Sequence, residues 1–279
     1  MSHRNLNRFI VLAAAFGIVA VAAAEPPHAS STAAHAPAGH GEAHWTYSGA
    51  GGPDEWGKLA TDFKTCSVGH HQSPIDLPAA APVAAGALRA EFPAAALTIS
   101  PTAHLGSAVH NGHTIQVEFP HGDTLRIGGV PFELAQFHFH APSEHTVAGQ
   151  HFPAEIHFVH KSAAGKLAVI GVLVKEGAAN PAFASFDSAL PKSSGAKALL
   201  DKVALDVAGL LPKTRTIDRY DGSLTTPPCS EQVSWFVMTT AIELSKEQIA
   251  TLTTALPENA RPVQPPNGRA LIVDELAVK

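Results

Sequence analysis

The segment QFHFH places two histidines, His138 and His140, two residues apart and among phenylalanines. Successive side chains of a β-strand point to opposite faces. This spacing therefore predicts a strand with Gln136 and both histidines on one face, and Phe137 and Phe139 on the other. The apolar face suits a buried sheet. The opposite face carries imidazoles, which bind metal ions and transfer protons near neutral pH.

A second segment, AEIHFVH, offers a third histidine in the same kind of pattern. Alternation puts Glu155 and His157 on one face, so His138, His140 and His157 can converge if the two strands are neighbours. Three neutral imidazoles at one point match a catalytic zinc ion, which keeps its fourth tetrahedral position for water. A ligating imidazole also needs an acceptor on its other nitrogen, and Gln136 and Glu155 are placed to provide one.

Other polar residues are weaker signals when taken alone. We expect His145, His151 and His160 to be buried, hydrogen-bonded structural histidines and not ligands. The segment YDGSLTTPPCSEQVSW has two prolines after two threonines, which predicts a loop. Its hydroxyls, on Thr225 and Thr226, can each donate and accept a hydrogen bond.

The elements that must position these residues are mostly strands. Apolar residues alternate in DTLRIGG, AEIHFVHK, LAVIGVLVKE and VSWFVMTTAIEL, and SAVHNGHTIQVEF carries an Asn-Gly pair that is typical of a hairpin. Strict alternation from that turn puts His113 with Ile115 and Val117, opposite Gln116. The pattern predicts one mainly β domain, built on a large, mostly antiparallel sheet with a few short peripheral helices.

Two segments predict helices. The segment SKEQIATLTTAL begins with a capping box, Ser245 followed three residues later by Gln248, and ends before Pro257. A stretch rich in serine, alanine and lysine, at about 193–208, predicts a second helix.

The chain has 279 residues, of which 45% are hydrophobic, enough to bury a full core. Residues 1–24 predict a signal peptide, because two arginines precede a short apolar run that ends in alanines; an uncleaved membrane anchor is the alternative. Its removal leaves 17 basic and 24 acidic residues, a net charge of −7 that argues against nucleic-acid binding. Residues 25–43 predict a flexible leader rich in alanine, proline and histidine, and residues 44–279 the folded domain.

The sequence contains two cysteines, Cys66 and Cys229. An exported chain meets an oxidising compartment, so one disulfide bond is expected, with two buried thiols or two metal ligands as alternatives. The bond would close a loop of more than 150 residues. In the chain-entropy model this stabilises the fold by about 4–5 kcal/mol.

Taken together, these segments resemble the α-class carbonic anhydrases. The resemblance runs in order from Trp45 to the C-terminus through HWTY, HQSPIDL, HNGHTIQVEF, QFHFHAPSEHTVAGQHFPAEIHFVH, LAVIGV, GSLTTPPCSE and NARPVQP. It implies a central, twisted, mainly antiparallel sheet with a cone-shaped cavity and Zn2+ at its base. It also implies an enzyme that reversibly hydrates carbon dioxide to bicarbonate and a proton, by attack of zinc-bound hydroxide on carbon dioxide in an apolar pocket.

The same resemblance assigns roles to three sets of residues. The zinc ligands would be His138, His140 and His157. The groups that orient them would be Gln136, Glu155 and the main chain of Asn259. The substrate pocket would be lined by Gln116, Val159, Val169, Leu224, Thr226, Val233 and Trp235.

Three further residues would act on the reacting groups by this resemblance. Thr225 would accept a hydrogen bond from the zinc-bound hydroxide and pass its own proton to Glu144. His113 would carry the released proton towards buffer. The resemblance places it on the cavity wall with Gln116, which agrees with the strand alternation only if the Asn-Gly turn is irregular. The cysteine pair resembles that of secreted and bacterial members, and it would pin the LTTPP loop to the N-terminal region.

The sequence also departs from the family, and other functions stay open. Ala141 and Ala260 stand where many animal members have tryptophan; both positions lie outside the metal shell. One rival is a catalytically silent relative that binds ligands through the same fold, and another is a zinc-capture protein that uses the histidine-rich leader. The expected partner is the small-molecule substrate, with no nucleic acid and no membrane after signal cleavage, for a periplasmic or secreted monomer or homodimer.

Overall fold

The computed structural model describes residues 43–79, 97–99, 103–104, 106–119, 124–200, 204–205, 207–256 and 258–278. All of them belong to one unit of the chain, Glu42–Lys279. The predicted signal peptide, and the predicted leader up to residue 42, lie outside the described residues. No helix in the described part of the chain is long and apolar enough to cross a membrane.

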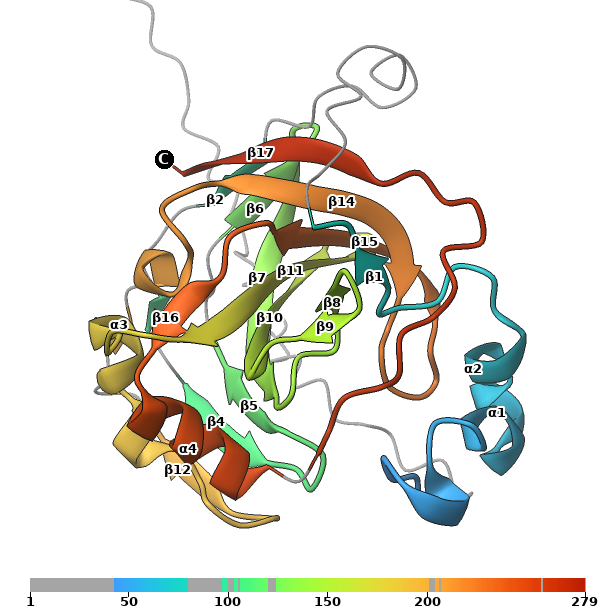
Figure 1. The fold of residues 1–279 in the computed structure, drawn as a ribbon, viewed down its shortest axis with the longest axis horizontal. Coiled ribbons are helices and arrows are strands. Elements are labelled where there is room, and N and C mark those ends of the chain that lie inside the picture. The colour runs from blue at the N-terminus through green and yellow to red at the C-terminus, as the bar shows by residue number, and fades with distance from the viewer. Residues whose placement is uncertain are drawn as a thin grey trace, which may run out of the picture. The chain divides into compact units, whose positions relative to one another are not determined.

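A twisted sheet of 12 strands organises this unit (Figure 1). Its main path, in spatial order, is β10 (Ala154–Ser162), β11 (Leu167–Glu176), β15 (Glu231–Met238), β14 (Thr216–Ser223), β17 (Ile272–Val278), β2 (Leu97–Ile99), β6 (Thr124–Ile127), β7 (Val130–His140), β5 (Ile115–Glu118), β4 (Ser107–His110) and β12 (Lys197–Leu199). Strand β16 (Ile242–Leu244) pairs with β11, and β10 also pairs with β7. Most neighbours are antiparallel, whereas β11–β15, β11–β16 and β17–β2 are parallel. The predicted fold class is confirmed.

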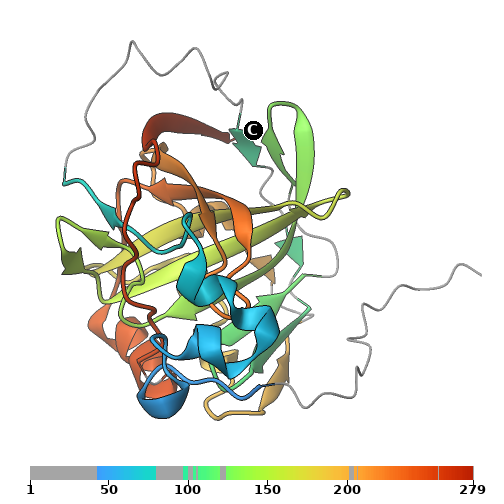
Figure 2. The same cartoon turned by 90° about the vertical axis from the view of Figure 1, so that its right-hand side faces the viewer.

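Smaller elements surround this sheet. One small sheet contains β1 (Asp76–Leu77), β8 (Thr146–Val147) and β9 (Gln150–His151), and another contains β3 (Ala103–His104) and β13 (Ala204–Leu205). The α-helices are α1 (Trp56–Leu59), α2 (Thr65–Val68), α3 (Pro181–Ala184) and α4 (Lys246–Ala255). The 3-10 turns are η1 (Gly49–Gly51), η2 (Thr61–Phe63), η3 (Asp187–Ala189) and η4 (Val207–Leu210). Figure 2 shows α1 and α2 together in front of the sheet, on the side that faces the viewer.

The two strands that carry the histidine motifs, β7 and β10, are neighbours. Their antiparallel register places His138 opposite His157 and Phe137 opposite Phe158. Phe137, Phe139 and Phe158 are fully buried in the main hydrophobic core. Because strand side chains alternate, the histidines face the opposite side of the sheet from these rings.

The helix predicted from Ser245 is confirmed as α4. The Ser245 hydroxyl accepts a hydrogen bond from the Gln248 N–H at 3.3 Å, and the Gln248 side chain accepts one from the Ser245 N–H at 3.1 Å. This reciprocal pair satisfies two backbone donors that the first turn of a helix leaves unpaired.

The helix predicted at about 193–208 is wrong, because this stretch contains β12, β13 and the turn η4. Backbone hydrogen bonds at both ends of β12 explain the difference. Ala196 C=O accepts from the His110 N–H at 3.0 Å, and the Leu200 N–H donates to Gly106 C=O at 3.1 Å. These bonds to the neighbouring hairpin outweigh a weak local helix propensity.

The predicted Asn-Gly hairpin is present as β4 and β5, but its turn is longer than two residues. Residues 111–114 lie outside both strands. Asn111 Oδ1 accepts hydrogen bonds from the N–H groups of His113 at 3.0 Å and Thr114 at 2.9 Å. This side-chain turn removes His113 from the strand alternation. Strict alternation therefore does not extend to His113, and both His113 and Gln116 line one cavity, as the resemblance implies.

The predicted disulfide between Cys66 and Cys229 is confirmed. The two cysteines are 163 residues apart in sequence, and the bond joins α2 to the loop between β14 and β15. Both pack with the buried Trp56 in a small apolar cluster. The loop that carries Thr225 and Thr226 is thereby attached to the N-terminal helices.

Candidate metal centre

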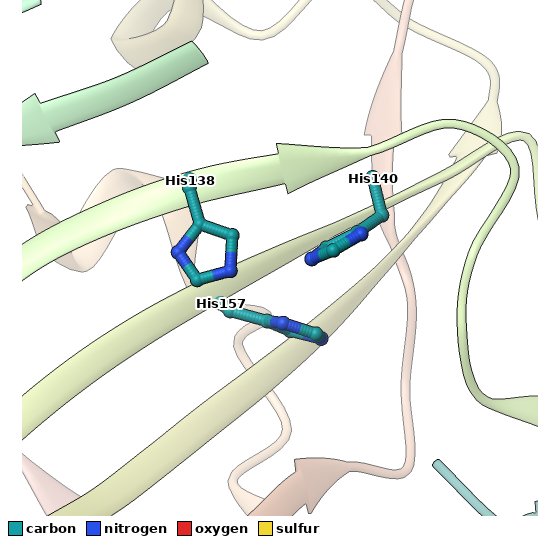
Figure 3. Close-up of side chains that lie close together, drawn as sticks. All are labelled: His138, His140 and His157. Carbon is teal, nitrogen blue, oxygen red and sulfur yellow. The ribbon is translucent and has the colours of Figure 1, made fainter. Parts of the chain in front are cut away.

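Three histidines meet on one face of the sheet, two from β7 and one from β10 (Figure 3). One ring nitrogen from each of His138, His140 and His157 lies within 4.8 Å of the others. His140 and His157 are each 1% exposed, and His138 is half-buried. The register explains the cluster, since His138 lies directly opposite His157 and His140 follows two residues later on the same face.

Each ring also contacts an oxygen of one of its predicted partners. The contacts join His138 Nδ1 to Gln136 Oε1 at 2.8 Å, His140 Nδ1 to the Asn259 carbonyl at 2.7 Å, and His157 Nε2 to Glu155 Oε1 at 3.0 Å. The last is a close contact whose geometry is not that of a hydrogen bond. Such contacts hold imidazole rings in one orientation.

Burial keeps these three imidazoles neutral. It lowers the pKa of His138 well below its usual value, helped by the charges of His140 and His157. Burial lowers the pKa of His140 to about 4, although the hydrogen bond to the Asn259 carbonyl acts to raise this pKa. Burial also lowers the pKa of His157, although the negative charge of Glu155 acts to raise it. Neutral imidazole is the form that binds a metal ion.

The donor set fits a metal ion. His140 Nε2 is buried and has no hydrogen-bond partner among the described residues, while its Nδ1 bonds to the Asn259 carbonyl. A buried ring nitrogen without a partner is uncommon and indicates a missing ion or water. Three neutral imidazoles are the donors of a catalytic zinc site. The arrangement can therefore hold a metal ion through His138, His140 and His157.

Glu155 connects this centre to a second layer of hydrogen bonds. Its Oε2 accepts from the N–H groups of Glu144 at 3.0 Å and His145 at 2.9 Å, and its Oε1 lies 2.7 Å from His145 Nδ1. Burial alone would raise the pKa of Glu155, but the charges of His145 and His157 hold it well below its usual range. His145 Nε2 in turn lies 2.7 Å from the Tyr220 hydroxyl. His145, Glu155 and His157 also cluster closely enough for a metal, but Glu155 already bridges the two rings.

Glu144 is a second buried carboxyl beside the histidines. Its Oε2 lies 3.4 Å from His140 Nε2, and its Oε1 accepts a hydrogen bond from the Arg261 N–H at 2.9 Å. Burial raises the pKa of Glu144 to about 7, opposed by the charge of His157 and by the nearby Thr225 side chain. Thr225 is buried. Glu144 Oε2 has no hydrogen-bond partner of good geometry among the described residues. The structure thus brings Glu144 and Thr225 together at the centre.

A cavity of about 170 Å³ opens over the three histidines. Its walls include most of the predicted pocket residues: Gln116, Val159, Val169, Leu224, Thr226 and Trp235. The predicted Val233 is not among the lining residues. It is 1% exposed and packs behind the wall, in the apolar cluster that contains Val169 and Trp235.

His113 is a half-buried residue of the cavity lining. Its ring stacks on Trp45 with 3.7 Å between centroids, and its pKa is lowered by burial and by the charge of His44. Trp45 and Tyr47 also line the cavity, and the sequence reasoning assigned neither of them a role. The motif HWTY contains both and was the signal that could have found them. The Tyr47 hydroxyl is buried without a hydrogen-bond partner among the described residues.

The three histidines expected to be structural all make hydrogen bonds. His145 and His160 are buried, and His160 Nδ1 bonds to the Phe158 carbonyl at 2.9 Å. His151 differs from the expectation of burial because it is exposed, although its Nδ1 bonds to the Ser143 carbonyl at 2.6 Å.

Comparisons with known proteins agree on one family. Residues 51–274 match the model of the eukaryotic-type carbonic anhydrase family. The chain is 42% identical over 230 residues to a carbonic anhydrase of Nostoc sp., covering 82% of this chain and 85% of that protein. It is 39% identical over 238 residues to a carbonic anhydrase of Neisseria gonorrhoeae, covering 84% and 90%. Among solved structures, the α-carbonic anhydrase of Thermovibrio ammonificans in complex with sulfanilamide matches with a TM-score of 0.76 and 41% identity, over 86% of this chain and 100% of that one.

Proposed function

The chain belongs to the eukaryotic-type, or α-class, carbonic anhydrase family, and from that membership we propose how its own residues carry out the family's reaction. The protein is an enzyme that reversibly hydrates carbon dioxide to bicarbonate and a proton. The observation that carries the assignment of residues is the convergence of three neutral histidines, among them His140, whose buried Nε2 has no hydrogen-bond partner among the described residues.

Zn2+ is the metal that we assign to this centre, with His138, His140 and His157 as its ligands. The neutral state of the rings and the partnerless His140 Nε2 support this assignment. When bound, zinc lowers the pKa of a coordinated water towards neutrality and so supplies a nucleophile, an effect for which carbonic anhydrases are the standard example. Gln136, Glu155 and the Asn259 carbonyl hold the rings in place. Their oxygens contact the rings at 2.7–3.0 Å.

Thr225 and Glu144 orient the reacting oxygen. The Thr225 hydroxyl can donate its proton to the Glu144 carboxylate, and it is then able only to accept from the attacking group. Glu144 is itself held by the Arg261 N–H at 2.9 Å. A fixed acceptor aligns a lone pair of the attacking oxygen for attack, and this alignment lowers the activation barrier.

The apolar wall holds carbon dioxide beside this group. Carbon dioxide has no net charge or dipole, so Val159, Val169, Leu224 and Trp235 can hold it without competing for the metal. Val233 supports the wall from behind. Gln116 and Thr226 are polar residues of the same cavity lining, and we assign Thr226 to contacts with bicarbonate. Weak binding of the substrate avoids stabilising the ground state, which favours turnover.

His113 takes the released proton towards solvent. It lines the cavity together with Gln116 and is half-buried, whereas His140 and His157 are buried. Imidazole accepts and releases protons near neutral pH, so a partly exposed histidine of the cavity can accept a proton through intervening water and pass it to buffer.

We also propose that the protein is exported, to the periplasm or beyond. Residues 1–24 would be the signal peptide, residues 25–43 a leader, and residues 44–279 the catalytic domain. The disulfide supports an oxidising compartment.

A direct test combines metal analysis with stopped-flow measurement of carbon dioxide hydration. We expect one zinc ion per chain and activity that requires it. His140→Ala leaves two imidazoles, so zinc affinity should fall by orders of magnitude and activity with it. His71→Ala, an exposed histidine that does not line the site's cavity, is the matched control and should keep both. Full zinc occupancy and activity in His140→Ala would end the assignment of ligands.

A further inference from the structure

The segment that follows α4 carries two contacts to the metal centre without belonging to a strand or helix. Residues 258–271 form no ladder with any strand of the described chain. Within this segment, the Asn259 carbonyl contacts His140 Nδ1, and the Arg261 N–H donates to Glu144 Oε1. Interactions other than strand or helix hydrogen bonds must therefore hold Asn259 and Arg261 in the positions that these contacts require.

The side chain of Arg261 provides such an anchor. It is 1% exposed, and it donates three hydrogen bonds of 2.9–3.0 Å to neutral oxygens. The acceptors are Gln72 Oε1, the Ser73 carbonyl and the Cys66 carbonyl. The guanidinium also lies over the Trp56 ring, 5.6 Å from its centroid. Burial of a charged group costs free energy unless the group is paired and hydrogen-bonded. The burial of the Arg261 guanidinium against neutral oxygens therefore calls for a structural or functional explanation.

The acceptors of Arg261 belong to a rigid frame. Cys66 is linked to Cys229 by the disulfide, and Gln72 Nε2 donates to the Cys229 carbonyl at 3.1 Å. Cys229 follows Thr225 by four residues in the same loop. The Arg261 side chain is therefore hydrogen-bonded to the same disulfide-linked frame that holds the threonine loop.

We propose that Arg261 is a positioning residue for the hydration reaction. Its guanidinium locks the segment around residues 259–261 onto the disulfide frame, and its own backbone N–H then holds Glu144 at the correct place for Thr225. This inference rests on the roles proposed above for Glu144 and Thr225. It predicts that the side chain acts on turnover, through geometry, beyond its contribution to stability.

Arg269 offers a matched control within the same segment. It is half-buried, donates to the main-chain carbonyls of Gln72 and Asp221 among others, and lies 5.5 Å from the centroid of the Tyr220 ring. Its backbone N–H, however, donates to the Pro266 carbonyl and not to a group of the metal centre. Loss of Arg269 should therefore lower stability in a similar way without moving Glu144.

The test compares Arg261→Ala, Arg261→Lys, Arg269→Ala and Thr225→Ala as zinc-loaded proteins. Turnover and KM for carbon dioxide hydration are measured per bound zinc, well below each midpoint of thermal unfolding. Hydrogen exchange of a peptide that covers residues 258–264 is followed by mass spectrometry. Guanidinium ion at millimolar concentration is then added to fill the space left in Arg261→Ala.

We expect the turnover of Arg261→Ala to fall by about 10-fold or more, because small displacements at a reacting centre reduce the rate. Its KM should change by less than about 2-fold. Exchange of the 258–264 peptide should rise, and guanidinium should restore part of the turnover. Arg261→Lys keeps the charge but fewer hydrogen bonds, so it should fall between wild type and Arg261→Ala. Arg269→Ala should keep its turnover per zinc.

Wild-type turnover per zinc in Arg261→Ala, or an equal loss in Arg269→Ala, would overturn the inference. If Arg261→Ala does not fold, Arg261→Lys decides by the same criterion. Should these variants keep full turnover while Thr225→Ala loses it, only the inference about Arg261 fails. Full turnover in Thr225→Ala would instead remove the proposed role of the loop, and with it the basis for Arg261.

Discussion

Burial sets the charge of the side chains that meet at the metal centre. It lowers the pKa of His140 to about 4 and raises that of Glu144 to about 7. Glu155 behaves differently from Glu144, although both are fully buried, because Glu155 receives hydrogen bonds from two backbone N–H groups and contacts two imidazoles. Two carboxyls in one site thus have different environments, and we assign them different tasks.

Thr225→Ala should keep zinc but lose turnover, because no hydroxyl remains to align the attacking group. Removal of one positioning contact typically costs about 10²–10³ in rate. Glu144→Ala should act in the same direction by taking away the acceptor of the Thr225 proton. Stopped-flow kinetics with zinc analysis measure both, and Thr225→Ser, which keeps the hydroxyl, is the control. Unchanged turnover in Thr225→Ala would refute the role assigned to this loop.

His113→Ala should lower the maximal turnover in dilute buffer, on the order of 10-fold or more, because a positioned proton acceptor is lost. The exchange between carbon dioxide and bicarbonate should stay nearly intact, since that step needs no proton release to solvent. Imidazole at high concentration should restore much of the turnover. If the variant matches wild type in dilute buffer, the proton leaves by another route.

At the scale of the elements, two neighbouring strands and one glycine determine how Glu155 supports the centre. Gly171 of β11 lies opposite His157 of β10. A Cβ at Gly171 would lie 2.9 Å from Glu155 Oε1, closer than side-chain atoms normally approach a Cβ. The missing side chain at this point of LAVIGVLVKE therefore leaves space for the carboxylate between the strands.

Gly171→Ala should displace Glu155 and weaken zinc binding. Loss of an outer partner of a ligating histidine typically costs about 10–100-fold in metal affinity. Competition with a chelator measures this affinity. Val172→Ala, which removes buried core volume on the same strand, is the control and should lower the unfolding midpoint with zinc affinity unchanged. Equal zinc affinity in Gly171→Ala and wild type would show that Glu155 tolerates the extra methyl group.

At the scale of the whole molecule, one covalent bond links distant parts of the chain. Cys66 and Cys229 are 163 residues apart, and their bond attaches the threonine loop to the N-terminal helices. Replacement of both by serine should lower the free energy of unfolding by about 4–5 kcal/mol in the chain-entropy model. Denaturant titration measures this, and wild-type protein kept in reductant should converge on the variant. Identical midpoints for the oxidised and serine forms would contradict the prediction.

The stability of the whole molecule should also depend on pH through Asp218. This residue is 3% exposed, and its Oδ1 has no hydrogen-bond partner in the described structure. Burial raises the pKa of Asp218 from 3.8 to about 6, against the lowering charge of His145. The folded state therefore binds a proton more tightly than the unfolded state. Its contribution to stability is greatest below pH 3.8 and is lost as the pH rises through about 6.

Asp218→Asn removes this ionisation and should stabilise the protein at pH 7.5, by up to about 3 kcal/mol at 1.36 kcal/mol per pKa unit. At pH 4 the difference between variant and wild type should nearly vanish. Thermal unfolding at the two pH values measures it. A stabilisation that is the same at both would exclude ionisation of Asp218 as the cause.

The sequence by itself determined the features that depend on local chemistry and strand periodicity. The alternation in QFHFH and AEIHFVH predicted which residues share a face, and the capping box at Ser245 predicted α4, because both depend on neighbours a few residues away. The ordered motifs from HWTY to NARPVQP identified the family, and the presence of two cysteines in a chain expected to be exported predicted the disulfide.

Only the tertiary structure decided the features that depend on contacts between distant segments. Residues 197–199 became a strand because β4 was available to pair with them, and His113 left the alternation because Asn111 capped its turn. Val233 lies behind the cavity wall, and Arg261 reaches oxygens almost 200 residues away in sequence. Such contacts follow from how the chain closes on itself, and local propensities are too weak to determine that closure.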